Sequence, residues 1–192
     1  MFESIRADMK RYEDLGGWHR RLGFWVTATC RFGFWADGMN RGTVRTALLA
    51  AHSLLCTPWL LFKGVYLPPR AKIGAGLRLP HPQNILMGAE CEIGENCSLF
   101  HDVTLGRGGG KPRPPKLGNN VQVFAGAKIL GDVVVGDNVE IGANAVVSRN
   151  VPSGSAVMVA PCRAVPIRTV LAFHGRSGER DKETEAPREV PT

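Results

Sequence analysis

Histidine is the residue of this 192-residue chain best suited to proton transfer near neutral pH. Two of the five histidines, His81 and His101, lie in a stretch rich in glycine and aliphatic residues. A neutral imidazole can take the proton from a hydroxyl while that oxygen attacks an electrophile. The other three are isolated in the sequence, and we expect them to be structural or surface residues. They are His19, His52 and His174.

The five cysteines form no CxxC pair and no Cys/His finger spacing. A disulfide framework or a metal site is therefore not expected. The first residues, MFESIRADMKRYEDLGG, carry both signs of charge and no apolar core, which does not match a signal peptide. We expect a cytoplasmic protein in a reducing compartment.

The residues that must position the two histidines follow a period of six. Aliphatic anchors recur at multiples of six positions, and many of them precede a glycine. The anchors are Met87, Ile93, Leu99, Leu105, Leu117, Val123, Ile129, Val135, Ile141 and Val147. Small or β-branched residues, including Cys91 and Cys97, stand two positions before the anchors and are expected to pack inside. A period of six is typical of a parallel β-helix, in which short strands stack coil on coil.

Two irregularities interrupt this period. An earlier set of anchors keeps the period in another register, which predicts a slip of two residues between Ile85 and Met87. This earlier set is Leu67, Ile73, Leu79 and Ile85. One anchor position is skipped between Leu105 and Leu117, and residues 107–116 (RGGGKPRPPK) are rich in glycine and proline. We expect residues 107–116 to protrude as a surface loop.

The pattern divides the chain into three zones. Residues 1–65 are expected to form an α-helical region, residues 66–168 the β-helix, and residues 169–192 a flexible charged tail. Helical spacing predicts one buried face in the first zone. Its residues are Leu22, Trp25, Thr29 and Phe32. The fold class is mainly β, with a short helical N-terminal region and a disordered C-terminal tail.

Residues 47–62 (ALLAAHSLLCTPWLLF) form the most apolar segment. They are fewer than the roughly 20 residues of a membrane span, so we expect a buried helix or a subunit interface. A helix resting on a membrane surface is the alternative. The formal charge of +7 favours anionic partners, such as a phosphorylated cofactor or phospholipid. No nucleic-acid partner is expected, because the basic residues form no stripe interleaved with aromatic residues.

Residues 65–168 resemble the hexapeptide-repeat acyltransferases, most of all the serine O-acetyltransferases and their polysaccharide O-acetyltransferase relatives. The resemblance rests on AKIGAGLRLPH (71–81), DVTLG (102–106), the loop with Arg113-Pro114, AGAKILGDVVVG (125–136), IGANAVV (141–147) and APCRAV (160–165). IRAD (5–8) is also similar to the serine enzymes. The resemblance implies a left-handed β-helix, a homotrimer with active sites between subunits, acetyl-CoA as cosubstrate and no metal.

In the resembling family three hexads make one coil, so equivalent corners recur every eighteen residues. When the two-residue slip and the six-residue loop insertion are added to this spacing, His81, His101, Ala125 and Ala143 are expected to stack along one edge. The resemblance assigns catalysis to His81, as general base, and contact with the pantetheine arm of acetyl-CoA to Ala125 and Ala143. His101 stands where the serine enzymes have glutamine. It is expected to position the acceptor or the imidazole, with a second catalytic base as the alternative.

Further residues complete the predicted site. Backbone N–H groups, either at the coil corner or at Gly108, are candidates for stabilising the oxyanion. Arg163, which follows the repeats, is expected to bind the phosphates of CoA. The acceptor is expected to contact Arg113, Asn84 and Asp102.

Three positions depart from the serine enzymes. Pro80 stands in place of an aspartate before the catalytic histidine, Tyr66 in place of the aspartate that orients it, and Pro114 in place of a loop histidine. A bound ammonium group needs a carboxylate partner in a dry pocket. We therefore expect the chain to stand closest to the polysaccharide O-acetyltransferases, with a hydroxyl of a sugar or glycan intermediate as acceptor, as in polysaccharide biosynthesis. Candidates for orienting His81 are Asp102, Glu90 and Glu92.

Three other functions are weighed against this hypothesis. Serine O-acetylation is the first alternative, and a non-catalytic trimeric scaffold is the second. A metal-dependent hydratase similar to the γ-carbonic anhydrases needs three histidines per metal, whereas this repeat zone holds only His81 and His101.

Overall fold

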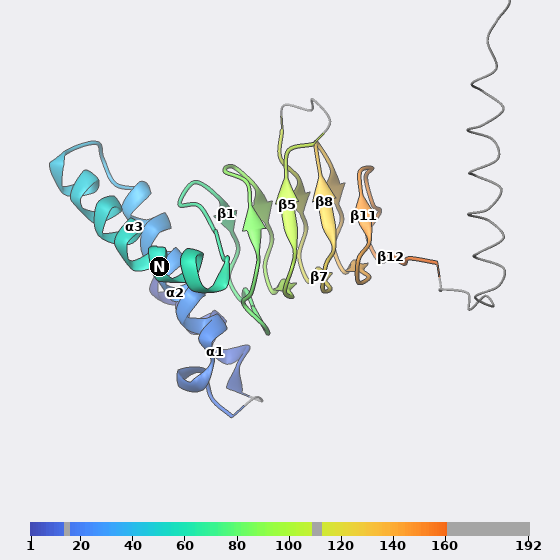
Figure 1. Ribbon diagram of the computed structural model, residues 1–192, viewed down its shortest axis with the longest axis horizontal. Helices are drawn as coiled ribbons and strands as arrows, with labels where there is room; N and C mark the ends of the chain where they lie inside the picture. Colours follow the sequence, from blue (N-terminus) through green and yellow to red (C-terminus); the bar gives the residue numbers. More distant parts are fainter. Residues whose placement is uncertain (14–15, 109–112, 161–192) are drawn as a thin grey trace, which may run out of the picture. The chain divides into compact units, whose positions relative to one another are not determined.

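The computed structural model describes residues 1–13, 16–108 and 113–160. Helices come first and short parallel strands follow (Figure 1). The helices are α1 (Phe2–Lys10), the 3-10 helix η2 (Trp18–Arg20), α2 (Leu22–Asp37) and α3 (Thr43–Lys63). The strands are β1 (Lys72–Ile73), β2 (Leu86–Met87), β3 (Glu92–Ile93), β4 (Ser98–Leu99), β5 (Thr104–Gly106), β6 (Lys116–Leu117), β7 (Gln122–Val123), β8 (Lys128–Leu130), β9 (Val134–Val135), β10 (Glu140–Ile141), β11 (Val146–Val147) and β12 (Ala156–Val157).

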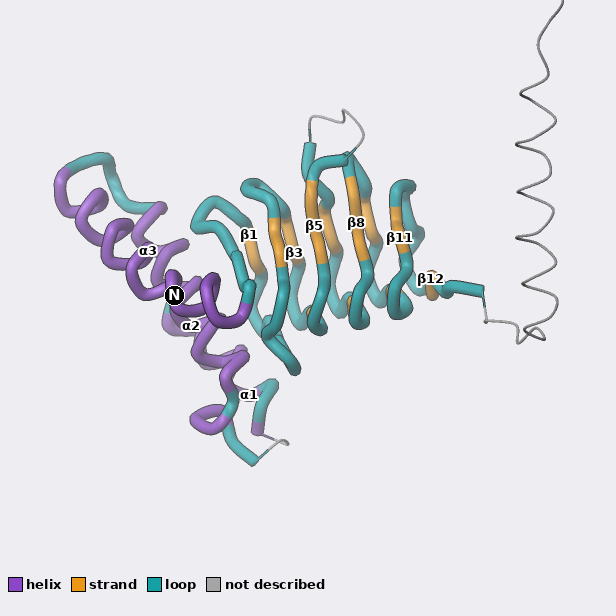
Figure 2. The backbone as a smooth tube through the Cα atoms, viewed as in Figure 1, coloured by secondary structure: helices purple, strands orange, loops and turns teal. Residues whose placement is uncertain are grey.

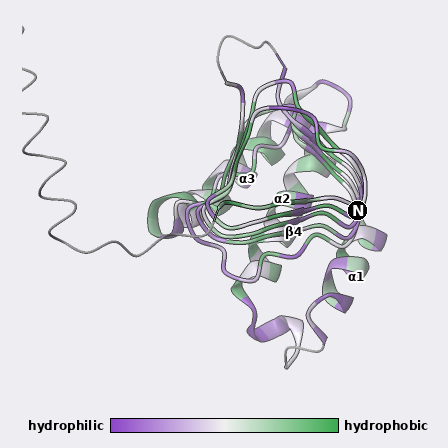
Figure 3. Ribbon diagram, turned by 90° about the vertical axis from the view of Figure 1, so that its right-hand side faces the viewer, coloured by the Kyte–Doolittle hydropathy of each residue, from purple (hydrophilic) through white to green (hydrophobic). Residues whose placement is uncertain are grey.

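The strands stack in three parallel sheets, which the chain visits in turn. The orders are β2-β5-β8-β11, β1-β3-β6-β9 and β4-β7-β10-β12. Figure 2 shows the coils side by side beyond the helices, and Figure 3 shows the sheets as the sides of a triangle. The predicted left-handed parallel β-helix with a helical N-terminal region is confirmed. The predicted tail, residues 169–192, lies outside the described residues.

The interior of the coils is a column of aliphatic anchors. Leu99, Val123 and Ile141 stack in one sheet and are 0% exposed. Cys91 and Cys97 are also 0% exposed, which confirms that they pack inside. Burial raises the pKa of the Cys91 thiol to about 11 and raises that of Cys97 as well, so both thiols stay neutral.

The slip of two residues lies earlier than predicted. Arg78 pairs with Ser98, twenty residues on, whereas Leu86 pairs with Thr104, eighteen residues on. The backbone N–H of Asp102 donates to the Gln83 carbonyl at 3.0 Å, just as that of Leu99 donates to the Arg78 carbonyl next to the pair Arg78–Ser98. Gln83 is therefore paired with His101, so the eighteen-residue spacing already holds at Gln83. The two extra residues therefore belong to the corner that contains His81, not to the step from Ile85 to Met87. That prediction was wrong.

The interruption at residues 107–116 inserts chain between β5 and β6. Leu105 pairs with Ile129, twenty-four residues on, and Leu117 pairs with Val135, eighteen residues on. Six more residues therefore separate β5 from β6 than the regular spacing needs, and β6 begins at Lys116, the last residue of the predicted loop. Residues 109–112 of this segment lie outside the described residues.

Helix α2 buries a different face from the predicted one. Trp25 is 45% exposed, whereas Val26 and Cys30 are nearly fully buried and belong to the core. The buried residues of α2 are Gly23, Phe24, Val26, Thr27, Cys30, Arg31, Gly33 and Ala36. The prediction was wrong because it counted aromatic residues as buried and did not include a buried arginine.

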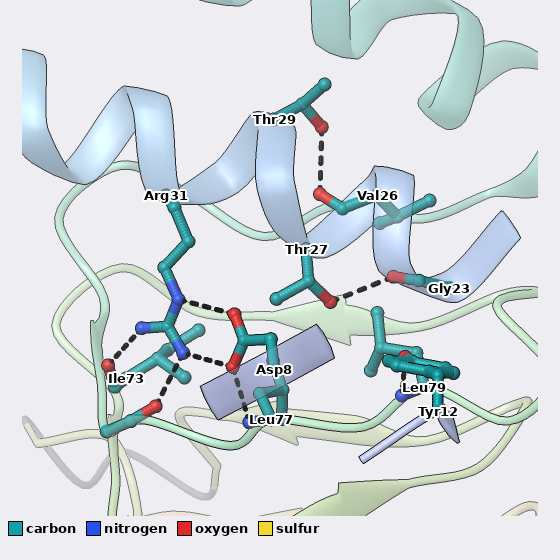
Figure 4. A network of polar contacts seen from close by, with 11 residues as sticks. Asp8, Tyr12, Gly23, Val26, Thr27, Thr29, Arg31, Ile73, Leu77 and Leu79 are labelled. Atoms are coloured by element: carbon teal, nitrogen blue, oxygen red, sulfur yellow. Dashed lines mark hydrogen bonds and ion pairs between the residues drawn. The ribbon is translucent and has the colours of Figure 1, made fainter. Parts of the chain in front are cut away.

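A buried ion pair joins the helices to the first coil (Figure 4). Arg31 Nε and Nη2 donate to the Asp8 carboxylate at 2.9 and 3.0 Å, and the same guanidinium donates to the carbonyls of Ile73 and Gly74 at 2.6 Å. The backbone N–H of Leu77 donates to Asp8 Oδ1 at 2.9 Å. Burial raises the pKa of the Asp8 carboxyl, while its bonds to Arg31 act in the opposite direction. The network therefore fixes α1 and α2 against the backbone of the first coil.

Candidate active site

One corner of the β-helix carries the predicted histidines, and we call it the histidine corner. It is the turn between the β4-β7-β10-β12 sheet and the β2-β5-β8-β11 sheet, and it recurs in each coil. His101 lies between β4 and β5, Ala125 between β7 and β8, and Ala143 between β10 and β11. The N–H of Gly126 donates to the His101 carbonyl at 3.0 Å, and that of Asn144 to the Ala125 carbonyl at 2.8 Å. His101, Ala125 and Ala143 therefore stack along one edge.

His81 joins this edge from the two-residue insertion. In the backbone ladder the counterpart of His101 is Gln83, and the Gln83 N–H donates to the His81 carbonyl at 2.8 Å. This tight turn, with Pro82 buried beneath it, leaves the His81 side chain exposed. The His81 and His101 ring centroids are 6.0 Å apart and their planes meet at 73°. The insertion thus brings two imidazoles together, one exposed and one half-buried.

Two phenylalanines flank the histidine corner and were missed by the sequence reasoning. Phe100 and Phe124 stack at 5.1 Å, and the His81 ring lies 6.4 Å from Phe100. Both follow a buried anchor and precede a corner residue, His101 or Ala125. Their shared place in successive coils was the signal that could have identified them. They give the corner an apolar side on which an imidazole can rest.

Asn84 and Asp102 lie at equivalent positions of the histidine corner in successive coils. Both have left-handed backbone conformations, with φ of 52° and 58°, which asparagine and aspartate tolerate better than most residues. Asn84 Nδ2 donates to Asp102 Oδ1 at 2.6 Å, and Lys128 Nζ donates to the Asp102 carbonyl. The structure therefore brings two of the three predicted acceptor-binding residues, Asn84 and Asp102, to the histidine corner.

The candidates for orienting His81 are bound elsewhere. Glu90 pairs with Arg107 at 3.2 Å, and Glu92 pairs with both Lys72 and Lys116 at 3.0 Å. Hydrogen bonds from Lys72 and Lys116 lower the pKa of the Glu92 carboxyl. Within the described residues, no carboxylate hydrogen-bonds to the His81 ring.

The small residues of the edge leave room above the backbone. Ala125 is half-buried and Ala143 is exposed, and as alanines they place only a methyl group each on the edge. Next to them, Gly126 has a φ of 76°, and a Cβ there would lie 2.0 Å from Asn144 Oδ1. A thin ligand arm could therefore approach the backbone here more closely than at a corner with larger side chains.

Three other predicted site residues lie away from this corner or outside the described chain. Gly108 follows β5 at the end opposite His101, and a Cβ on it would lie 2.9 Å from Leu130 Cβ. Arg113 is exposed on the segment before β6. Within one subunit the structure brings neither residue to the histidine corner. Arg163 lies outside the described residues.

A second cluster, also missed from the sequence, lies at the helical end. A cavity of about 230 Å³ is lined by Cys30 of α2, by His52 and Cys56 of α3, and by residues of the first coil. Cys56 Sγ lies 3.2 Å from His52 Nε2. A hydrogen bond with Cys30, and then the contact with His52, lower the pKa of the Cys56 thiol to about 5. The bond with Cys56 and burial raise the pKa of Cys30.

The part of the chain that the structure describes holds no group of three His, Cys, Asp or Glu side chains placed to bind a metal ion. The histidine corner itself carries two imidazoles, the Asp102 carboxylate, the Lys128 ammonium and the amide of Asn84.

The chain matches the family model "Bacterial transferase hexapeptide (six repeats)" over residues 114–149. It is 47% identical over 105 residues to a serine acetyltransferase of Helicobacter pylori, which covers 53% of this chain and 61% of that protein. A solved serine acetyltransferase in complex with CoA is 30% identical, with a TM-score of 0.66 over 84% of this chain and 68% of the other. The Neisseria gonorrhoeae serine acetyltransferase in complex with serine is 30% identical, with a TM-score of 0.62 over 84% and 67%.

These similarities and the coiled fold show that the chain belongs to the hexapeptide-repeat acyltransferase family. The chain spans about three fifths of the length of the curated Helicobacter pylori relative. The relatives named above are serine acetyltransferases. The expectation that the chain stands closest to polysaccharide O-acetyltransferases therefore finds no support.

Proposed function

We propose that the protein transfers an acetyl group from acetyl-CoA to the hydroxyl of L-serine, with His81 as general base. The observation that carries this proposal is the pair of imidazoles above an edge of small residues, in a β-helix shared with serine acetyltransferases. L-serine takes precedence over a sugar because the named relatives, one of them solved with serine, are serine enzymes. We propose a cytoplasmic location for the same reason.

The chemistry needs one proton acceptor at the histidine corner. His81 is exposed, so an acceptor hydroxyl can reach its ring nitrogen. The neutral imidazole removes the hydroxyl proton as the oxygen attacks the thioester carbonyl, and the imidazolium returns that proton to the departing CoA sulfur. His101, 6.0 Å away between centroids, orients the acceptor or the His81 ring. The backbone N–H groups of the corner are the candidates for stabilising the oxyanion.

An acceptor without an ammonium group, such as a sugar, is the second candidate. It is favoured by Pro80, which removes the carboxylate that the serine enzymes place beside the histidine, and by the exposed amides of Gln83 and Asn84. A neutral hydroxyl needs such hydrogen-bonding groups and no charged partner.

An acceptor screen that follows CoA release from acetyl-CoA distinguishes these proposals. Release that depends on L-serine supports the first, and release only with sugars or nucleotide-sugars supports the second. Release with none of the acceptors, from a folded protein that binds CoA, would favour a non-catalytic scaffold.

A large side chain on the small-residue edge is expected to weaken acetyl-CoA binding. Ala143→Trp places an indole where Ala143 now offers a methyl group, and the exposed position allows the change without unfolding. The KM for acetyl-CoA should rise on the order of tenfold or more, while the melting temperature stays near that of the wild type. Ala89→Trp, at an exposed alanine of another corner, is the matched control and should leave KM unchanged. Equal KM values for both variants would place the cosubstrate elsewhere.

The protein is expected to assemble as a trimer. His81 and Ala143 are exposed on a single subunit, and Arg113, which is predicted to contact the acceptor, lies before β6 and away from the histidine corner, so a neighbouring subunit would have to supply it. Light scattering should give a mass near three times the 20.8 kDa of the chain. A monomeric mass at assay concentration, with full activity, would contradict an active site between subunits.

A further inference from the structure

Helix α3 leaves most of its apolar side chains exposed, so the expectation that residues 47–62 form a buried helix was wrong for the single chain. Leu54, Leu61 and Phe62 are 75, 72 and 81% exposed. We define the α3 apolar face as Val44, Leu54, Leu55, Leu61 and Phe62, whose exposed side chains share one side of the helix. A surface helix of a globular protein places polar residues on its outer side. Only 6% of the most apolar 18-residue stretch of α3 is buried within the described chain. An exposed apolar face of this kind is typical of a binding surface.

The packing of α3 decides how it can meet that partner. Helix α3 is long enough and apolar enough to cross a membrane. One side, however, packs against α2, where His52 is 4% exposed and its ring lies 6.5 Å from Phe32. At its end, Gly64 turns the chain with a φ of 63° directly into the first coil, and Tyr66 already pairs with Leu86. These contacts suit a helix that lies along a surface, with one side on the protein.

The charged residues of α3 itself and of the segments next to it, from residue 38 to residue 89, are all positive. No aspartate or glutamate occurs between Gly38 and Ala89. The Lys and Arg residues of that stretch are Arg41, Arg45, Lys63, Arg70, Lys72 and Arg78. Arg45 pairs with Asp37 and Lys72 with Glu92. Arg41, which is exposed, and Lys63, which is half-buried, lie at the two ends of the apolar face, and neither pairs with a carboxylate within the described residues.

We infer that the α3 apolar face docks on an anionic phospholipid surface, with the helix lying in the membrane interface. Exposed leucine and phenylalanine side chains enter the boundary of the acyl chains, while Arg41 and Lys63 meet the headgroups. A second copy of the chain fits less well. In a two-fold contact between α3 helices, the cations of one copy would face those of the other with no carboxylate from residues 38–89 between them. This inference does not depend on the proposed acetyl transfer.

The test is flotation of the full chain with vesicles of phosphatidylcholine alone or mixed with phosphatidylglycerol. The wild type should float with the anionic vesicles at low salt and much less with phosphatidylcholine alone. The double variant Leu61→Ser/Phe62→Ser should lower the bound fraction at least about tenfold, since it removes two large apolar side chains. Arg41→Gln/Lys63→Gln should lower affinity several-fold, and only for anionic vesicles.

The matched control is Phe2→Ser, which removes an equally exposed phenylalanine, 74% exposed, from α1. It should float as the wild type does. Circular dichroism should show the same helix content for all variants, because the changed side chains are on the surface. Three results would overturn the inference: no flotation of the wild type, equal loss with Phe2→Ser, or full binding by Leu61→Ser/Phe62→Ser. A smaller mass of this double variant without lipid would also overturn it, by identifying a second copy as the partner.

Discussion

Replacing His81 by alanine is expected to lower kcat for acetyl transfer by about 10² to 10⁴, with acetyl-CoA binding unchanged. The variant lacks the imidazole that would take the acceptor proton, so kcat falls. It keeps the small-residue edge formed by Ala125 and Ala143, so acetyl-CoA still binds. Steady-state rates from CoA release give kcat, and calorimetric titration with CoA gives the binding.

His101→Gln is the matched control for the same experiment. It restores the residue that the serine enzymes carry at this place and keeps a hydrogen-bonding side chain, so kcat should stay within about tenfold of the wild type. The two histidines would have their roles exchanged if His101→Gln abolished turnover while His81→Ala kept most of it.

Much of the β-helix could be predicted from the sequence because its interior admits one kind of residue at fixed intervals. Leu99, Val123 and Ile141 stack in one sheet, and that column defines the period. The slip could not be placed from the pattern alone. Ile85 and Met87 are both buried, at 0 and 2% exposed, so either could serve as the anchor. Only the strand pairing shows that the extra residues belong to the His81 corner.

The helical region was harder to predict because its packing depends on residues far apart in the sequence. Trp25 was assigned to the buried face of α2, but the buried side is set by Arg31 and by its contacts with Asp8 and the first coil. Cys30 and Cys56 meet only because α2 and α3 pack together. No local periodicity signals such contacts.

For the candidate site, counting residues from coil to coil predicted that the two histidines lie near each other, and their ring centroids are 6.0 Å apart. The predicted register was wrong, because Gln83 and not His81 stands opposite His101 in the backbone ladder. The count could not show that His81 stands on an insertion and is exposed while His101 is half-buried. It also could not show that Asn84 bonds to Asp102. Those features depend on turn geometry and side-chain direction, which the period does not determine.

Replacing Asp8 by alanine is expected to destabilise the fold by about 3–5 kcal/mol, because it leaves a buried guanidinium without its carboxylate. Arg31 and Asp8 are 4 and 1% exposed, so water cannot replace the lost partner. The backbone N–H of Leu77 also loses its acceptor. Urea unfolding, followed by circular dichroism, measures the change in the free energy of unfolding.

The double variant Asp8→Leu/Arg31→Met separates the cost of an unpaired charge from the value of the pair. Burial raises the pKa of the Asp8 carboxyl despite its bonds to Arg31, so removing this carboxylate from water costs more than those bonds return. The double variant should therefore be less destabilised than Asp8→Ala, although the carbonyls of Ile73 and Gly74 lose their donor. Glu90→Gln, which breaks an exposed pair, is the control and should change stability by less than about 1 kcal/mol. If Asp8→Ala matched this control, the Asp8–Arg31 network would not be what fixes the helices to the first coil.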